Sequence, residues 1–312
     1  MVQFLTVENL STQYDTKSGP VQAVQNVSFS IEHGESVGIA GESACGKSTL
    51  GFSLLRTIVG GKITSGRIFF EGSPLLELSE DEFDRSYRWK KISMVFQGAM
   101  NSLDPVYNIS QQFSDVLNQH GHVGDDSEVI RSALHSVGLS HDILKKYPHE
   151  LSGGMKQRVV IAMALLLKPK LVIADEPTTA LDVLVQSQIL NLFKNLKKQG
   201  VSFMLISHDL ATISELCEKI GIMYGGKIVE FGSSKEIFDN PKHPYTQALI
   251  QSIPKLRGTE KPKYIPGNPP SLLNPKSECR FIDRCPAAME KCKKEPPSIK
   301  TDSGYVLCWL YE

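Results

Sequence analysis

The sequence has no surplus of either charge, and this limits the partners that it could have. Lysine and arginine together number 34 among 312 residues, and aspartate and glutamate also number 34. A general nucleic-acid-binding protein needs a basic surplus, so the balance argues against that class. Apolar residues make up 41% and charged residues 22%, which is typical of a soluble globular protein with one large or two smaller domains.

Long apolar runs are also missing. The longest, VVIAMALLL at 159–167, has about half the length that a membrane-spanning helix requires. The first residues, MVQFLTVENLS, lack the basic start and apolar stretch of a secretory signal. We therefore expect a chain that stays in the cytoplasm and docks on something in the membrane. The sequence contains no internal repeat.

Apolar strands that alternate with helical segments predict an α/β fold with a mostly parallel sheet covered on both faces. Residues 97–150 are polar and helix-like, which indicates a helical insertion. After about residue 233 prolines concentrate, so we expect a separate extension of extended structure and turns. The expected elements are strands within 21–41, a helix at 48–59, a helix at 155–168, a strand at 171–175, a helix at 183–199 and a strand at 202–208.

The stretch GESACGKST at 41–49 fits the template of a phosphate-binding loop between a strand and a helix. Gly41 and Gly46 let backbone N–H groups approach phosphate oxygens. The following helix adds its positive N-terminal end. Lys47 would reach the β- and γ-phosphates, and Ser48 would bind Mg²⁺.

Two further stretches complete a nucleotide site. In LVIADE, Asp175 and Glu176 follow a buried strand; Asp175 suits the metal, and Glu176 is placed to activate a water for attack on the γ-phosphate. In LSGGM, Ser152 is a candidate N-cap, and the glycines after it leave N–H groups bare. This second anion site fits a dimer in which each phosphate loop meets the LSGGM of the other chain.

With these motifs in order, about 230 residues of the chain resemble the nucleotide-binding subunit of an ATP-binding-cassette transporter. The resemblance implies a P-loop NTPase cassette at 1–232, with a RecA-like core, an antiparallel β subdomain and a helical subdomain at about 98–157. The extension then covers 233–312. The resemblance implies these ATP-binding residues: Tyr14, Gly41, Glu42, Ser43, Ala44, Cys45, Gly46, Lys47, Ser48, Thr49, Ser152, Gly153, Gly154 and Asp182.

Roles follow from the same resemblance. Tyr14 would stack on adenine, and Asp182 would lie at the dimer seam. The implied catalytic residues are Glu176, His208, which contacts the γ-phosphate, and Gln97, which contacts Mg²⁺ and the lytic water. The implied magnesium ligands are Ser48, Gln97 and Asp175.

The loop departs from the family pattern at two positions. Ala44 stands where glycine is usual, and Cys45 where a small hydroxyl is usual. Ala44 fits only if its φ is negative, since a left-handed conformation costs about 1–2 kcal/mol. We expect the change to be tolerated. Cys45 is interpreted as a small residue, with a redox-sensitive thiol as the alternative.

The extension resembles one subfamily. NPKHPYTQALIQSIP at 240–254 is similar to a segment of oligopeptide and dipeptide importers, and four cysteines resemble those that hold a [4Fe-4S] cluster in some members. Close Cys-x2-Cys pairs are missing, which favours iron–sulfur over zinc; four unliganded thiols are the remaining alternative. The four are Cys279, Cys285, Cys292 and Cys308.

The resemblance implies an ATPase that energises peptide import, on the cytoplasmic side of the membrane. Its implied partners are an identical or paralogous ATPase subunit, two membrane permeases and, indirectly, an extracellular solute-binding protein. Importers of oligosaccharides or nickel, a non-transport ATPase of the same fold, and a metal-binding regulatory protein with an inert cassette are the alternatives.

Overall fold

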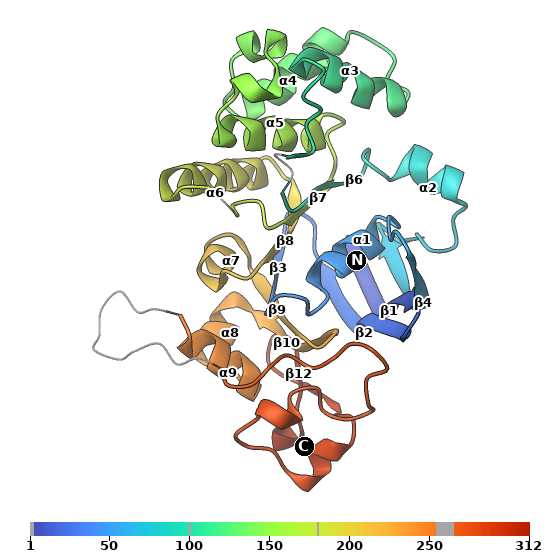
Figure 1. Ribbon diagram of the computed structural model, residues 1–312, viewed down its shortest axis with the longest axis vertical. Coiled ribbons are helices and arrows are strands. Elements are labelled where there is room, and N and C mark those ends of the chain that lie inside the picture. The colour runs from blue at the N-terminus through green and yellow to red at the C-terminus, as the bar shows by residue number, and fades with distance from the viewer. Residues whose placement is uncertain (1–2, 99–100, 180, 254–264) are drawn as a thin grey trace. The chain divides into compact units, whose positions relative to one another are not determined.

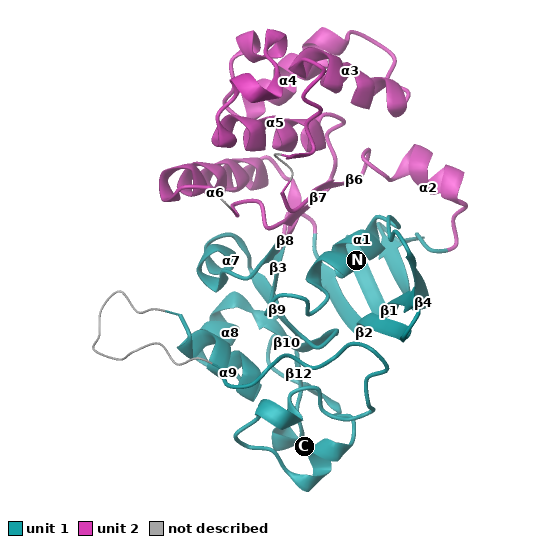
Figure 2. Cartoon of the chain, viewed as in Figure 1, with its two compact units in different colours: residues 1–32, 36–76, 206–312 teal, residues 33–35, 77–205 magenta. Residues whose placement is uncertain are grey.

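The computed structural model describes residues 3–98, 101–179, 181–253 and 265–312. They form two compact units, coloured separately in Figure 2. Unit 1 comprises residues up to 32, residues 36–76 and the residues from 206 onward, whereas unit 2 comprises residues 33–35 and 77–205. Neither unit is therefore a simple half of the sequence.

One sheet of unit 1 is antiparallel, with the strand order β2-β1-β4-β5. Figure 1 labels the first three of these strands. Its strands are β1 (Leu5–Thr16), β2 (Gly19–Ile31), β4 (Gly61–Phe70) and β5 (Ser73–Pro74). Buried and more exposed residues alternate along much of β1, as expected for a sheet with one covered face. Helix α1 (Lys47–Leu54) contacts β1 and β2, and a buried hydrogen bond of 2.8 Å joins the hydroxyls of Thr12 and Ser53.

The other strands of unit 1 follow the order β11-β12-β10-β9-β3. They are β3 (Ser36–Ala40), β9 (Lys219–Tyr224), β10 (Lys227–Ser233), β11 (Ser298–Lys300) and β12 (Tyr305–Leu307). β3 and β9 are parallel, and all of β3 is buried. Helix α7 (Leu210–Leu216) packs so closely on β3 that a Cβ added to Gly38 would lie 2.1 Å from the side chain of Ile213.

The C-terminal segment is more regular than its prolines suggest. Two helices, α8 (Ser234–Asp239) and α9 (Pro244–Gln251), stand where we expect extended structure, so that part of the prediction is wrong. Pro244 occupies the first turn of α9, where its missing N–H costs nothing. Farther on, β12 pairs with β10, so the segment adds strands to the sheet. Two of the prolines, Pro254 and Pro262, lie outside the described residues.

Unit 2 contains buried strands and the helical insertion. β6 (Ile92–Val95) and β7 (Leu171–Asp175) are parallel and wholly buried, and β8 (Ser202–Ser207), up to Leu205 in this unit, lies next to β7. The helices are α2 (Glu80–Ser86), α3 (Ile109–Gln119), α4 (Asp126–Ser136), α5 (Gly153–Leu165) and α6 (Val183–Lys198).

The insertion is helical, as the sequence predicts. A capping box between Asn108 and Gln111 starts α3, and its buried residues, Ile109, Phe113 and Leu117, recur every four positions. α4 packs against both α3 and α5. The apolar stripe of a helix thus supplies the core of this part of unit 2.

Most predicted helices and strands are present in the structure, and the differences lie at their ends. β7 has the predicted bounds, and α6 and α5 differ from the predictions by a few residues. α1 ends at Leu54 instead of at 59, because Arg56 adopts a φ of 55°, which a right-handed helix cannot contain. Among the described residues, no helix is long and apolar enough to cross a membrane.

The buried His243 predicts a pH-dependent stability. It is fully buried, and burial lowers its pKa from 6.5 to about 3, while its Nδ1 accepts the N–H of Tyr245 at 3.0 Å. The unfolded chain takes up a proton below pH 6.5 that the folded chain does not, so stability present above that pH is lost as the pH falls toward 3. At pH 5 we expect a loss of about 2 kcal/mol from this residue.

Urea unfolding at pH 7 and pH 5 measures this loss. His243→Asn keeps a side-chain oxygen for the Tyr245 N–H and should lose about 2 kcal/mol less than the parent between the two pH values. The control is His141→Asn at an exposed histidine, which should behave as the parent does. Equal pH dependence in the parent and His243→Asn would contradict a neutral, buried His243.

Candidate nucleotide-binding site

The phosphate loop joins β3 to α1 in unit 1, and its glycines are sterically required. Gly41 has a φ of 153° and Gly46 a φ of 106°. A Cβ on Gly41 would lie 2.1 Å from the carbonyl oxygen of Met223, and a Cβ on Gly46 would lie 2.0 Å from that of Ala23. Real side chains do not approach backbone so closely. Only glycine therefore permits this packing of the loop against β9 and β2.

Lys47 lies inside the loop rather than in solvent. Its side chain is buried, and its Nζ donates hydrogen bonds to the carbonyl oxygens of Gly41 and Glu42, both at 2.8 Å. The ammonium group is therefore fixed at the mouth of the loop, next to the N-terminus of α1. Thr49, in the first turn of the helix, shares a hydrogen bond of 3.3 Å with the hydroxyl of Tyr14.

Ala44 does not meet the condition that the sequence sets for it. Its φ is 61°, in the left-handed region, whereas we expect a negative value for an easily tolerated alanine. The loop therefore keeps the conformation that glycine would favour, at a cost of about 1–2 kcal/mol. The Ala44 side chain is exposed, so no steric clash adds to that cost.

Cys45 is enclosed, as a small packing residue would be. It is 4% exposed, and burial raises the pKa of its thiol even though Lys47 lies nearby. Its carbonyl oxygen accepts the N–H of Gly226 at 3.0 Å, which ties the loop to the turn after β9. A raised pKa and low exposure both disfavour reaction with oxidants, so the structure supports the small-residue interpretation.

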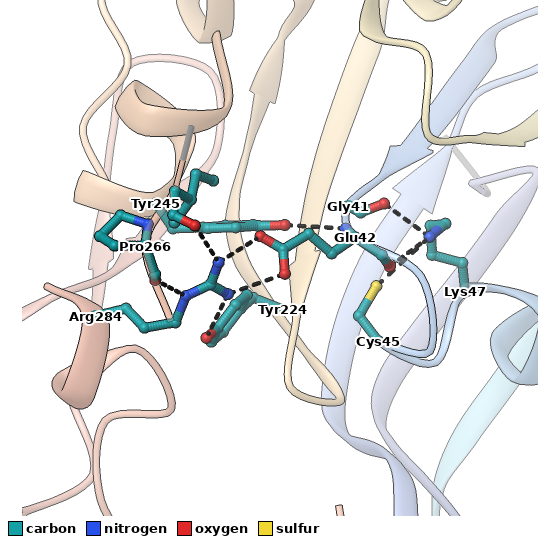
Figure 3. A network of polar contacts seen from close by, with 9 residues as sticks. Gly41, Glu42, Cys45, Lys47, Tyr224, Tyr245, Pro266 and Arg284 are labelled. Carbon is teal, nitrogen blue, oxygen red and sulfur yellow. Dashed lines mark hydrogen bonds and ion pairs between the residues drawn. The ribbon is translucent and has the colours of Figure 1, made fainter. Parts of the chain in front are cut away.

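Glu42 has contacts that the sequence does not reveal. Its N–H donates to the hydroxyl of Tyr245 at 3.0 Å, and its carboxylate accepts two hydrogen bonds from Arg284, at 2.9 and 3.1 Å (Figure 3). Arg284 lies 242 positions later in the chain, and no local spacing pattern could have paired the two.

His208 and Asp209 follow β8 in unit 1. His208 is exposed, directly after the buried Ser207. Asp209 caps α7 by accepting the N–H of Ala211 at 2.9 Å, and its own N–H donates to the hydroxyl of Ser207 at 3.0 Å. This tight turn fixes the backbone that carries the histidine.

In unit 2, the predicted acidic pair ends β7. Asp175 is only 1% exposed, and Glu176 after it turns the chain with a φ of 47°. The hydroxyl of Thr179 donates to the carboxylate of Glu176 at 2.7 Å, and the N–H of Thr179 donates to the Glu176 carbonyl at 3.2 Å. Gln97 is exposed just beyond the end of β6.

Two caps in unit 2 orient the remaining predicted residues. Ser152 is the N-cap of α5, as expected, and accepts the N–H of Met155 at 3.3 Å. Asp182 caps α6 by accepting the N–H of Val185 at 2.9 Å. A Cβ on Gly154 would lie 2.8 Å from the side chain of Val185, so the two helix starts pack closely at this glycine.

The four late cysteines gather in the C-terminal segment of unit 1. Cys279, Cys292 and Cys308 are buried and Cys285 is partly buried; the N–H of Cys279 donates to the carbonyl of Cys292 at 2.9 Å. Burial, assisted by the neighbouring thiols, raises the pKa of Cys279 to about 11. In the described residues, however, no three His, Cys, Asp or Glu side chains are arranged to hold one metal ion.

Two family models match the sequence. The model described as ABC transporter matches residues 24–179, and the model described as Oligopeptide/dipeptide transporter, C-terminal region, matches residues 229–292. The second match contains Cys279, Cys285 and Cys292 and ends before Cys308.

Curated relatives match over nearly the whole chain. A dipeptide transport ATP-binding protein, DppD, from Caldanaerobacter subterraneus subsp. tengcongensis is 45% identical over 99% of this chain and 97% of its own length. The DppD of Bacillus subtilis is 42% identical over 100% of this chain and 96% of its own length. An oligopeptide transport ATP-binding protein, OppD, from Escherichia coli is 42% identical over 94% and 88%.

Solved structures show the same fold. A dimeric ATP-binding cassette in a post-hydrolysis state, bound to ADP and Pi, matches with a TM-score of 0.65 and 26% identity over 74% of this chain and 98% of its own. The cassette cbiO1 from Clostridium perfringens matches with a TM-score of 0.65 and 28% identity over 77% and 92%. The fold and the ordered motifs thus define an ATP-binding-cassette ATPase. The chain belongs to the ABC transporter family, in the group with the oligopeptide/dipeptide C-terminal region.

The left-handed Ala44 predicts that a stability measurement will show a gain. Ala44→Gly should raise the free energy of unfolding by about 1 kcal/mol, because the relief of backbone strain exceeds the added entropy of the unfolded chain. Ala44→Val should lower it, since a β-branched side chain tolerates a positive φ least. Urea unfolding of the three proteins measures both changes. A loss of stability in Ala44→Gly would show that the loop is not strained there.

Proposed function

We propose that this chain binds and hydrolyses ATP as a subunit of an importer of dipeptides or oligopeptides. The observation that carries the proposal is the match over 99% of the chain to a dipeptide transport ATP-binding protein, together with the matching C-terminal region. A cassette alone would support only an ABC ATPase, whereas the C-terminal region supports the peptide substrate.

The phosphate loop is proposed to bind the triphosphate. The backbone N–H groups after Glu42 and the helix N-terminus would contact phosphate oxygens, and Lys47 would move its hydrogen bonds from loop carbonyls to the β- and γ-phosphates. Ser48 would bind Mg²⁺, with Asp175 and Gln97 as the further magnesium ligands. Tyr14 would stack on the adenine, and Thr49, whose hydroxyl shares a hydrogen bond with that of Tyr14, would belong to the same binding site.

Hydrolysis is assigned to Glu176 as the general base. Its carboxylate is oriented by the Thr179 hydroxyl at 2.7 Å, and a carboxylate at the end of β7 can accept a proton from the attacking water. The γ-phosphate would also contact His208, and Ser152, Gly153 and Gly154 of a second cassette across a dimer seam that includes Asp182. Loss of the γ-phosphate would remove these contacts and let the dimer open.

The proposed partners follow from this cycle. A second ATPase subunit, identical or paralogous, completes the nucleotide sandwich, as the dimeric state of a structural neighbour supports. Two membrane permeases would receive the motion, so the chain would work as a peripheral subunit on the cytoplasmic face. An extracellular solute-binding protein would deliver the peptide.

A cysteine-held cofactor is a further part of the proposal. We propose that the four late thiols take up a [4Fe-4S] cluster, with Zn²⁺ as the alternative. Their gathering in one short segment supports this. Among the described residues no three side chains fit one metal ion as they lie, so uptake of Zn²⁺ would require local rearrangement, whereas each thiolate of a [4Fe-4S] cluster would bind a different iron. No step of hydrolysis is assigned to the cofactor.

Metal analysis of anaerobically purified protein tests the cofactor. A cluster predicts about four iron and four sulfide ions per chain and visible charge-transfer absorbance, which Cys292→Ser should reduce and Cys217→Ser, outside the segment, should not. About one zinc per chain would support the alternative. Neither metal above background would contradict both.

Glu176→Gln tests the proposed hydrolysis. The amide keeps the size of the side chain but cannot accept a proton, so turnover should fall at least about 100-fold while ATP affinity is unchanged. ATP should then trap a dimer that size-exclusion chromatography with light scattering detects. Lys47→Ala should instead weaken ATP binding itself. Turnover of Glu176→Gln near that of the parent would refute the assignment.

A further inference from the structure

We propose that Arg284 is a positioning residue of the ATP site, which it completes from the C-terminal segment. Its ion pair with Glu42 holds the start of the phosphate loop in place and neutralises a carboxylate that would otherwise repel the triphosphate. The inference rests on the proposed ATP binding and assigns to the extension a part in it.

The pair has the geometry of a strong charge-assisted contact. Both terminal nitrogens of Arg284 donate to the two carboxylate oxygens of Glu42, at 2.9 and 3.1 Å. The side chain of Arg284 is only 6% exposed and that of Glu42 is 23% exposed. A bidentate pair shielded from solvent fixes direction as well as distance, unlike a surface salt bridge.

Arg284 is itself held on every side. Its Nε donates to the carbonyl of Pro266 at 2.7 Å, and one terminal nitrogen donates to the hydroxyl of Tyr224 at 3.1 Å (Figure 3). The other terminal nitrogen donates to the carbonyl of Ile265 at 3.2 Å. The guanidinium also lies over the rings of Tyr224 and Phe281, at 5.7 and 6.0 Å from their centroids. The arginine is thus a fixed point to which the loop is attached.

An aromatic cluster makes this fixed point rigid. The rings of Tyr224, Tyr245 and Phe281 pack against one another with centroids 4.4 to 5.4 Å apart. Tyr224 ends β9, Tyr245 is in α9, and Phe281 belongs to residues 279–308, the cysteine segment, which carries the four late cysteines. Three separate stretches of chain therefore meet around Arg284.

Glu42 connects Arg284 to Lys47, the lysine proposed to bind phosphate. The Glu42 N–H donates to the Tyr245 hydroxyl at 3.0 Å, while the Glu42 carbonyl accepts the Nζ of Lys47 at 2.8 Å. Side chain, N–H and carbonyl of one residue are all engaged. A shift of Arg284 therefore displaces the backbone that orients Lys47.

The positive charge of Arg284 should favour ATP binding as well, in addition to its effect on the position of the loop. A carboxylate within the phosphate loop opposes the binding of a polyanion, and the opposition is strong where solvent is excluded. The guanidinium cancels it at contact distance. Loss of Arg284 would leave the negative charge of Glu42 in place, whereas loss of both groups would remove the repulsion again.

The experiment compares Arg284→Met, Arg284→Lys and the double variant Glu42→Gln with Arg284→Met, in the full-length purified protein. ATP and ADP affinities, KM and kcat for ATP, and thermal stability are measured for each. The matched control is Glu295→Gln, which removes another ion pair of the C-terminal segment, that with the buried Lys227 on β10, without touching the loop.

We expect Arg284→Met to raise Kd and KM for ATP about ten-fold, with a smaller change in kcat and a penalty that shrinks at high salt. Arg284→Lys should lie in between, since it keeps the charge and loses the bidentate geometry. The double variant should recover the part of the affinity that charge repulsion costs but not the part that the tether to the loop supplies, so its Kd should lie between those of Arg284→Met and the parent. Glu295→Gln should match the parent in Kd.

Three results would overturn the inference. They are unchanged ATP affinity in Arg284→Met, no recovery in the double variant, and an equal loss in Glu295→Gln, which would indicate a general structural role. Should Arg284→Met fail to fold, Arg284→Lys decides: unchanged ATP affinity in that variant, or an equal loss in Glu295→Gln, would overturn the inference. If the parent protein itself binds no ATP, the proposed function fails instead, and the two failures are thereby distinguished.

Discussion

The nucleotide site depends on the absence of side chains at two positions of the phosphate loop. A Cβ on Gly41 would lie 2.1 Å from the carbonyl oxygen of Met223, and a Cβ on Gly46 would lie 2.0 Å from the carbonyl oxygen of Ala23. The loop therefore lies directly on β9 and β2, and the Gly226 N–H bonds it to the turn after β9. Neither strand can shift without moving the loop, so β2, β9 and the phosphate loop hold one another in place.

The sequence predicts what depends on neighbours along the chain. The bounds of β7 follow from an uninterrupted apolar run, and the cap of α5 follows from Ser152 before two glycines. The loop motif carries its own context of strand and helix. Local propensity fails where tertiary contacts decide: α1 stops early because Arg56 turns left-handed and donates to the carbonyl of Leu75 at 3.1 Å.

In the C-terminal segment, prediction from the sequence fails for a second reason. Two short helices stand where its prolines favour extended structure. α8 contains no proline, and in α9 Pro244 lies in the first turn, where a proline starts a helix as readily as a proline elsewhere ends one. Its contribution to the site is beyond sequence reasoning of any local kind, since Arg284 and Glu42 are joined only when β9, α9 and the cysteine segment have come together around the aromatic cluster. The pairing is a property of the folded core.

A phosphate loop poses a particular problem of support, and Glu42 is a physical solution to it. Backbone N–H groups that face a ligand cannot also be bonded to the protein, so the loop must be held by the groups that remain. Glu42 uses its own N–H, its carbonyl and its carboxylate for this purpose, at the start of the loop. An acidic side chain near a polyanion would be unfavourable alone. Paired with the buried Arg284, it becomes an anchor for the loop, and Arg284 lies within the match to the oligopeptide/dipeptide transporter C-terminal region.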